Sequence, residues 1–133
     1  MTAGPRTVLV VDDEAPLRRV LERSLERVGY RVISSGSGEE AYTLLESETA
    51  DAALLDIRLP TMSGLALYVA LAHRWPELTG RMAIMTGDAE AQEVRAWLEE
   101  HQCKVLRKPF NLAEITAWLG GLWQDREQQT SNG

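Results

Sequence analysis

Five short apolar segments alternate with five amphipathic segments, and this alternation constrains the fold more than any other feature. The apolar segments cover residues 7–11, 30–34, 51–55, 81–85 and 104–106. The first, TVLVV, is apolar or β-branched throughout, as is typical of a strand buried on both faces. The segment that follows it carries Leu17, Leu21 and Leu25 at helical spacing. Such an alternation predicts a parallel sheet with helices on both faces.

The chain length narrows this class. At 133 residues the chain is one domain and too short for an eight-unit barrel. We therefore expect an α/β fold with a doubly wound, five-stranded parallel sheet, which is a flavodoxin-like (βα)5 domain. Known sheets of this class have the strand order 2-1-3-4-5, and we expect the same order here by analogy.

Capping residues mark where helices begin and end. Pro16 suits a first helical turn, and Gly29 ends the same helix. Ser37 followed three residues later by Glu40 indicates a capping box. Asn111 is the expected N-cap of the last helix.

The remaining helices and the chain end complete the organisation. Helices are expected over residues 63–74 and 89–100, the first ending at Trp75-Pro76. Beyond residue 123 the sequence is polar. Residues 1–123 are therefore expected to form the domain, and residues 124–133 a frayed polar tail or a linker stub.

Composition excludes several classes of function. The net charge of −6 disfavours direct nucleic-acid binding. No run approaches the roughly 18 apolar residues of a membrane span, and we expect the N-terminal residues not to be a signal peptide. The single Cys103 forms no internal disulfide, which fits a reducing, cytoplasmic setting.

Four apolar segments run into polar side chains at their carboxyl ends. The residues that follow them are Asp12, Asp13, Asp56, Thr86 and Lys108. Because the carboxyl ends of parallel strands share one edge of the sheet, we expect these side chains to meet in one crevice.

The chemistry of that crevice points to phosphoryl transfer. Clustered carboxylates stay ionised together only beside a cation, and oxygen ligands suit Mg²⁺. Lys108 and the Thr86 hydroxyl are suited to contact a phosphoryl oxygen. Asp56 stands apart from the Asp12–Asp13 pair, so it is the best candidate for a nucleophile that forms an aspartyl-phosphate.

From about Thr7 to Trp123, the chain resembles the receiver domain of two-component response regulators. The matching motifs are Val11-Asp12-Asp13-Glu14, Leu55-Asp56 with Leu59-Pro60 and Met62-Ser63-Gly64, Met85-Thr86-Gly87-Asp88, and Lys108-Pro109-Phe110. Four motifs in the family's order are strongly specific, whereas an Asp-Asp pair alone is often just a polar loop.

The resemblance implies a cytoplasmic switch that is phosphorylated on Asp56 by a histidine kinase or a phosphotransfer protein. Asp12 and Asp13 then look like Mg²⁺ ligands, together with Asp56 and the backbone carbonyl of Arg58. Thr86, Gly87 and Lys108 look like the residues that contact the phosphoryl group and switch the domain. Such a domain catalyses only its own phosphorylation and dephosphorylation and is otherwise not an enzyme.

One position departs from the family pattern. Val105 stands where many receivers carry the aromatic residue that swings inward on phosphorylation. We therefore expect the output to travel through the loop at residues 87–90 and the following helix. A candidate partner surface lies on the last two helices, at Trp97, Trp118 and Trp123. The partner there could be a second copy of this chain.

Single motifs bear on the sub-family and on two alternative functions. The motifs around Thr86 and Lys108 look most like receivers attached to hybrid histidine kinases, so the chain is a candidate fragment of one. Phosphatases of the haloacid dehalogenase type carry a second Asp two residues after the nucleophile, and this chain has Arg58 there. This disfavours that function. A flavin or nucleotide module expects a Gly-rich loop after the first strand, where Asp12-Asp13-Glu14 stands.

Overall fold

A single five-stranded parallel sheet forms the centre of the computed structural model, which describes residues 4–87 and 92–132. The strands are β1 (Thr7–Val11), β2 (Arg31–Ser35), β3 (Ala52–Asp56), β4 (Met82–Thr86) and β5 (Lys104–Arg107). They lie in the order β2-β1-β3-β4-β5, with every neighbouring pair parallel. The predicted flavodoxin-like fold is confirmed.

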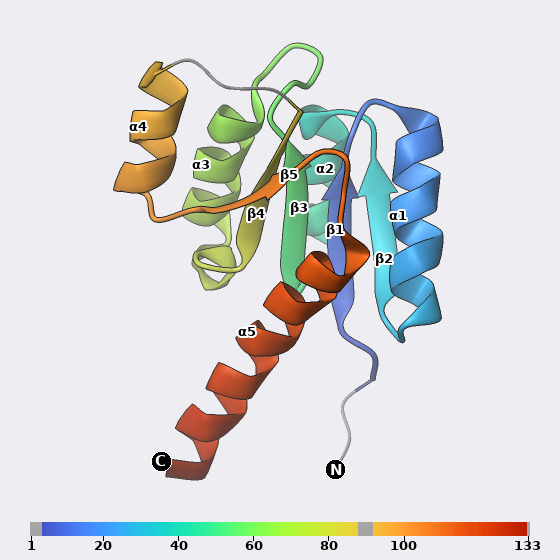
Figure 1. Ribbon diagram of the computed structural model, residues 1–133, viewed down its shortest axis with the longest axis vertical. Coiled ribbons are helices and arrows are strands. Elements are labelled where there is room, and N and C mark those ends of the chain that lie inside the picture. Colours follow the sequence, from blue (N-terminus) through green and yellow to red (C-terminus); the bar gives the residue numbers. More distant parts are fainter. Residues whose placement is uncertain (1–3, 88–91, 133) are drawn as a thin grey trace.

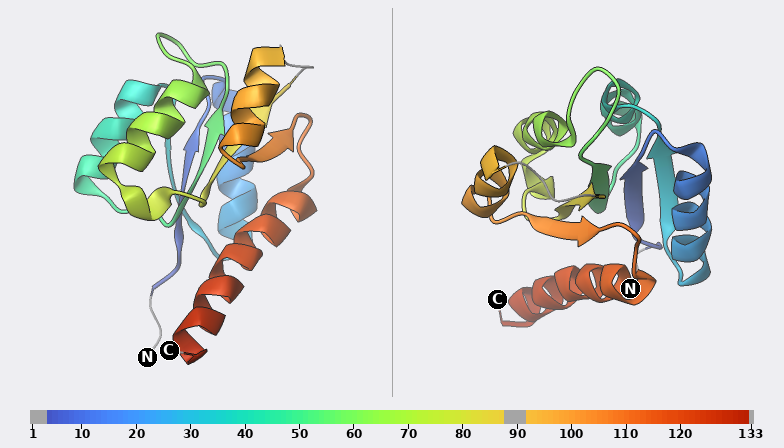
Figure 2. Two further views of the ribbon diagram at one scale, coloured as in Figure 1. Left: turned by 90° about the vertical axis from the view of Figure 1, so that its left-hand side faces the viewer. Right: turned by 45° about the horizontal axis from the view of Figure 1, so that its top comes forward.

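Helices cover both faces of this sheet (Figures 1 and 2). They are α1 (Ala15–Arg27), α2 (Gly38–Ser47), α3 (Gly64–Arg74), α4 (Gln92–Glu100) and α5 (Leu112–Asn132), with a 3-10 helix η1 (Pro76–Leu78). α1 and α5 lie on one face, and α2, α3 and α4 lie on the other.

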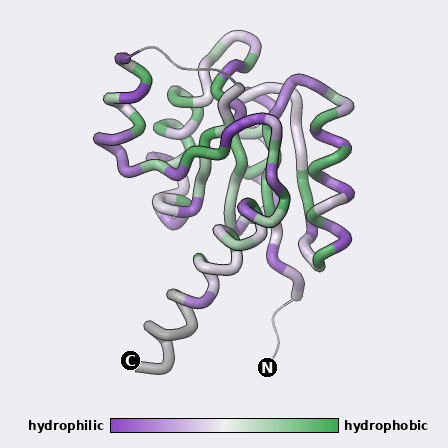
Figure 3. Tube along the Cα trace, viewed as in Figure 1, coloured by the Kyte–Doolittle hydropathy of each residue, from purple (hydrophilic) through white to green (hydrophobic). Residues whose placement is uncertain are grey.

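The alternation of side chains along β1 divides the core into two layers. Val8 and Val10 pack with buried residues of α1 and α5, whereas Leu9 and Val11 pack with those of α2, α3 and α4. All four side chains are fully buried. The surface helix α1 shows the matching amphipathic pattern, with purple and green alternating along its length in Figure 3.

The predicted helix caps form. Ser37 Oγ accepts the Glu40 backbone N–H at 3.2 Å, and Asn111 Oδ1 accepts that of Glu114 at 3.3 Å. Ser63 Oγ caps α3 in the same way, at 3.1 Å from the Ala66 nitrogen. These bonds fix where each helix leaves its loop, and α3 and α5 both begin beside the polar edge of the sheet.

Two features were not predicted. Pro76 ends α3 as expected but also begins the short helix η1. α5 continues to Asn132, where a frayed tail or a linker stub was expected from residue 124. Its last residues include good helix formers without an apolar stripe, so periodicity gave no signal while propensity favours the helix.

Trp123 anchors α5 where the helix passes the end of the sheet. Its indole nitrogen donates to the Tyr30 hydroxyl at 3.0 Å, and the Arg6 guanidinium lies 4.4 Å from its ring centre. Beyond this contact α5 projects away from the sheet (Figure 1). Among the described residues, no helix has the length and apolar character needed to cross a membrane.

Candidate functional site

Lys108 lies at the centre of the polar edge of the sheet, in the loop that follows β5. Its ammonium nitrogen is 3.3 Å from Asp56 Oδ2, 3.2 Å from Asp12 Oδ2 and 3.9 Å from Glu14 Oε1. Its backbone N–H donates to the Thr86 carbonyl at 2.7 Å, which ties the loop to the end of β4. The convergence predicted for the ends of β1, β3, β4 and β5 is thereby observed.

Three carboxylates face one another beside this lysine. Asp12, Asp13 and Asp56 each offer an oxygen within 4.8 Å of the others. Asp12 is fully buried, Asp56 is buried, and Asp13 is exposed at the mouth. The cluster therefore presents an all-oxygen set of candidate metal ligands.

Asp12 leaves one oxygen unsatisfied. Its Oδ1 accepts the Glu14 backbone N–H at 2.9 Å. Its Oδ2 is buried and has no hydrogen-bond partner among the described residues, because the ammonium of Lys108 is near but not in hydrogen-bond geometry. A buried carboxylate oxygen without a donor is costly unless a cation compensates it.

Asp56 is held at the tip of β3 by its neighbours. Its Oδ1 accepts the Arg58 backbone N–H at 3.2 Å, and the Ile57 N–H donates to the Met85 carbonyl at 3.0 Å. Gly64 packs directly against this turn, because a Cβ there would overlap the Asp56 carbonyl and lie 2.9 Å from Ile57 Cα. A residue without a side chain is therefore required where α3 begins.

Burial and charge shift the ionisation of the central pair. Burial raises the pKa of Asp56, and the nearby charge of Asp12 adds to this, although the Arg58 N–H and Lys108 oppose it. Burial lowers the pKa of Lys108, but the charges of Asp56 and Asp12 outweigh it and bring that pKa above its ordinary value. The site therefore keeps Lys108 charged. The charge of Lys108 is not enough to offset the effect of burial on Asp56.

A hollow of about 340 Å³ opens over these groups. It is lined by Asp13, Glu14, Asp56, Ile57, Arg58, Gly87 and Lys108. Thr86 is buried beneath it at the end of β4. Val105, the departure from the aromatic pattern, lies on β5 opposite Ile84 and packs against the core on the α4 side.

Two residues near the site were not among the predicted site residues. Glu14 lines the hollow and faces Lys108. The Arg18 guanidinium donates to the Asp12 backbone carbonyl at 2.6 Å. Glu14 adjoins the predicted acids in sequence and was detectable, whereas Arg18 reaches the loop from α1 through a contact that no spacing rule indicates.

Known proteins share both the sequence pattern and the fold. A family model described as the response regulator receiver domain matches residues 8–119. The transcriptional regulator NtrC of Salmonella typhimurium is 36% identical over 110 residues, covering 83% of this chain and 23% of that protein. The regulatory protein PhoP of Bacillus subtilis is 34% identical over 112 residues, covering 84% and 46%.

Solved structures agree on the fold. The chemotaxis protein CheY4 of Vibrio cholerae superposes with a TM-score of 0.78 at 23% identity, over 88% of this chain and 98% of that one. A CheY-like receiver domain protein from Methanospirillum hungatei gives a TM-score of 0.79 at 24% identity, over 98% and 100%. This chain spans about a quarter of NtrC and about half of PhoP. Since the family model matches most of the chain and the acidic edge lies where its motifs converge, the chain belongs to the response regulator receiver domain family.

Proposed function

We propose that this receiver accepts a phosphoryl group on Asp56 from a phosphohistidine of a histidine kinase or phosphotransfer protein. The observation that carries the proposal is the placement of Lys108 Nζ within 3.3 Å of Asp56 Oδ2, at the edge of an open hollow. A carboxylate there can reach a donor phosphorus, and a lysine is ready to contact the transferred oxygens.

In the proposed step an Asp56 carboxylate oxygen attacks the phosphorus of the donor. An O–P bond forms, the P–N bond of the phosphohistidine breaks, and the released imidazole nitrogen takes up a proton. Lys108 and the hydroxyl of Thr86 then donate to phosphoryl oxygens, and Gly87 leaves the approach to the hollow free of a side chain. Hydrolysis of the acyl phosphate returns Asp56 to its resting state.

Mg²⁺ is the cofactor that fits the donor set. Asp12, Asp13 and Asp56 supply oxygens within 4.8 Å of one another, and the unsatisfied Asp12 Oδ2 is an acceptor without a donor. We propose Asp13, Asp56 and the Arg58 backbone carbonyl as direct ligands, with Asp12 acting mainly through water. When bound, the ion neutralises charge that develops on the phosphoryl oxygens.

The kinase partner is proposed to meet α1 beside the site. Arg19, Arg23 and Arg27 recur every four residues along its exposed side and form a mixed stripe with Glu22 and Glu26. Val20 lies beside this stripe and is 60% exposed. A charged stripe of both signs beside an exposed apolar side chain is a surface that a partner helix could contact.

Output and context remain proposals that rest on the sequence. Homodimerisation is proposed through α4 and α5, using Trp97 and Trp118, which are only partly buried. Trp123 is buried against Tyr30 and is not available for that surface. Four further proposals are carried by sequence features alone. They are attachment to a hybrid histidine kinase, a cytoplasmic location, the absence of direct nucleic-acid contact, and a linker role for residues 124–133.

Incubation with acetyl phosphate and Mg²⁺, read out by intact mass, tests the function. One phosphoryl group is expected, stable in acid and labile in base, and it should be absent from Asp56→Asn. Asp51→Asn is the matched control, since Asp51 caps the Thr7 nitrogen at the other end of β1. Continuous turnover of varied phosphate esters would instead support a phosphatase, and full labelling of Asp56→Asn would rule out the assigned residue.

A further inference from the structure

Asp12, the buried acid of the cluster, is held in place by three hydrogen bonds. Its backbone N–H donates to the Ser35 carbonyl at 3.2 Å, and its Oδ1 accepts the Glu14 backbone N–H at 2.9 Å. Its backbone carbonyl accepts the Arg18 guanidinium at 2.6 Å. Ser35 and Glu14 contribute backbone groups, which a substitution leaves in place. Of the three bonds, the one from Arg18 alone depends on the side chain of a neighbour.

The bond from Arg18 also affects Asp13. The Asp12 carbonyl and the Asp13 N–H belong to one peptide plane, which is rigid because its C–N bond has partial double-bond character. A donor on the Asp12 carbonyl oxygen therefore sets the direction in which the backbone enters Asp13. Asp13 is exposed and lines the hollow, so burial does not fix its position. The placement of its carboxylate depends on the plane that Arg18 holds.

Arg18 reaches this plane from the start of α1, across the loop that follows β2. Its backbone N–H donates to the Glu14 carbonyl at 3.0 Å, so the helix fixes where the side chain begins. A Cβ at Gly36 would lie 3.2 Å from a guanidinium nitrogen of Arg18 and 3.9 Å from its central carbon. The guanidinium thus lies in close contact with Gly36, and a larger residue there would displace it.

We propose that Arg18 is a positioning residue for the acid pair at the sheet edge. By holding the Asp12–Asp13 peptide plane, it keeps Asp13 and the unsatisfied Asp12 Oδ2 where a divalent cation can bind both. Ligands that are already ordered bind without first losing conformational freedom. The inference rests on the proposed function, because the cation in question is the proposed Mg²⁺. It adds a residue of α1 that touches neither the cation nor the phosphoryl group.

Arg18→Met tests the positioning in the metal-free protein, since Met has a similar length and no donor. The NMR order parameter of the Asp13 amide should fall from about 0.85, typical of a rigid backbone, toward about 0.6, typical of a flexible one. The matched control is Arg74→Met, which removes an exposed arginine at the end of α3. It should leave the Asp13 order parameter unchanged.

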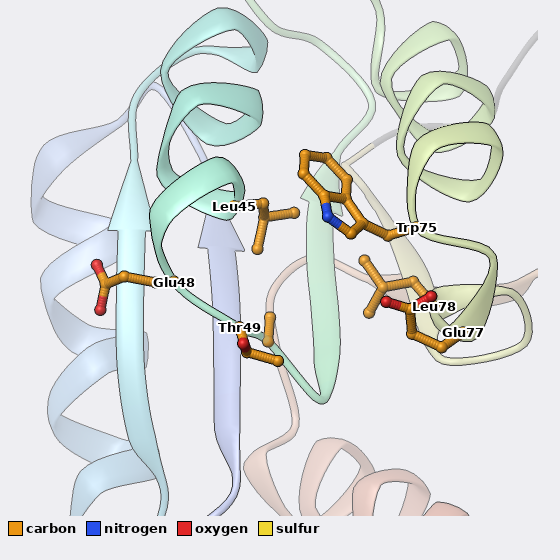
Figure 4. Close-up of a pocket in the computed structure, with 7 residues that line it drawn as sticks. Leu45, Glu48, Thr49, Trp75, Glu77 and Leu78 are labelled. Carbon is orange, nitrogen blue, oxygen red and sulfur yellow. The ribbon is translucent and has the colours of Figure 1, made fainter.

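The Mg²⁺ affinity of the unphosphorylated protein, measured by calorimetry, is the second readout. Arg18→Met should weaken it at least about fivefold, because contacts that orient metal ligands have effects of this order or larger. Arg18→Lys keeps a donor for the Asp12 carbonyl and should stay within about twofold of wild type. Leu45→Val controls for lost stability. Leu45 faces Trp75 across a hollow of about 70 Å³ where α2 ends (Figure 4), so this variant should leave the affinity unchanged.

Gly36→Val displaces the guanidinium without altering any acid of the cluster. Gly36 is not one of the glycines with a positive φ, so the substitution does not strain the backbone. It should weaken Mg²⁺ binding in the wild-type background and have no further effect in Arg18→Met. This non-additivity is the result expected if Gly36→Val acts through Arg18.

Two results would overturn the inference and leave the proposed function intact. They are an unchanged Asp13 order parameter in Arg18→Met, and equal Mg²⁺ affinity of Arg18→Met and wild type. A loss of affinity that disappears in about 0.5 M KCl would also overturn it, because it would identify a long-range effect of charge. Absence of Mg²⁺ binding by wild type would overturn the proposed cofactor and this inference with it. Circular dichroism of each variant verifies that it is folded.

Discussion

Lys108 Nζ lies 3.3 Å from Oδ2 of Asp56, although the two residues stand 52 positions apart in the chain. The sheet makes this contact possible, because β3 and β5 end at the same edge on either side of β4. The same ammonium lies 3.2 Å from Oδ2 of the buried Asp12. One lysine therefore divides its positive charge between two buried carboxylates and compensates neither of them fully.

Replacing Lys108 with Met should destabilise the protein by about 3 kcal/mol in the absence of Mg²⁺, since it leaves two buried carboxylates without this counter-charge. Urea unfolding at pH 7 measures this. The matched control is Lys104→Met, which removes the exposed pair with Glu114 at 3.7 Å and should cost no more than about 0.5 kcal/mol. Equal losses in the two variants would show that the charge of Lys108 is not what matters.

Asp56→Asn should stabilise the metal-free protein at pH 7, because the amide removes a buried negative charge. Burial raises the pKa of Asp56 in the folded state, so the folded protein disfavours its charged form. As pH falls through this raised pKa, Asp56 is protonated in the folded protein before it is protonated in the unfolded chain. Wild type therefore gains stability relative to Asp56→Asn. The gap between variant and wild type should thus narrow on going from pH 7 toward the ordinary carboxyl range. Urea unfolding across this pH range measures the gap, and a gap that widens with acid contradicts the assignment.

Asp13→Ala should weaken Mg²⁺ binding by roughly tenfold or more, since it removes the exposed carboxylate of the cluster. Isothermal titration calorimetry measures the loss. Glu22→Ala is the control, because Glu22 is paired with Ser34 outside the cluster and its loss should not change the affinity. If Asp13→Ala binds Mg²⁺ as well as wild type does, Asp13 is not a ligand.

Substitutions at two glycines distinguish the effect of close packing from the effect of helix propensity. Gly64→Ala should cost about 3 kcal/mol or more, because its Cβ would overlap the turn that holds Asp56. Gly120 lies inside α5, and a Cβ there would meet nothing within 4 Å. Gly120→Ala should therefore stabilise by about 0.5–1 kcal/mol. Thermal unfolding of both variants tests the contrast, and similar changes in both would refute it.

Much of the fold followed from the sequence because its signals are local. Buried strands appear as apolar runs, and Ser37 and Asn111 mark helix starts by their capping chemistry. The site followed from topology, since Asp12, Asp56 and Lys108 close their strands at one edge. Arg18 was missed because its contact with the Asp12 carbonyl depends on how α1 packs. The length of α5 was missed because its end has no apolar periodicity.

The last prediction concerns how phosphorylation changes the domain. Val105 packs into the core from β5 and is too short to move between two positions as an aromatic residue does. Of the predicted switch loop at residues 87–90, only Gly87 is among the described residues, and it lines the hollow beside Lys108. Movement of Thr86 toward the phosphoryl group should therefore be passed to Gly87 and to α4.

Backbone amide NMR with and without beryllofluoride, which stands in for the phosphoryl group, is the test. Large shifts are expected at Gly87 and from Gln92 to Trp97, with Val105 changing little. Shifts confined to Asp12, Asp56 and their direct neighbours would refute this route.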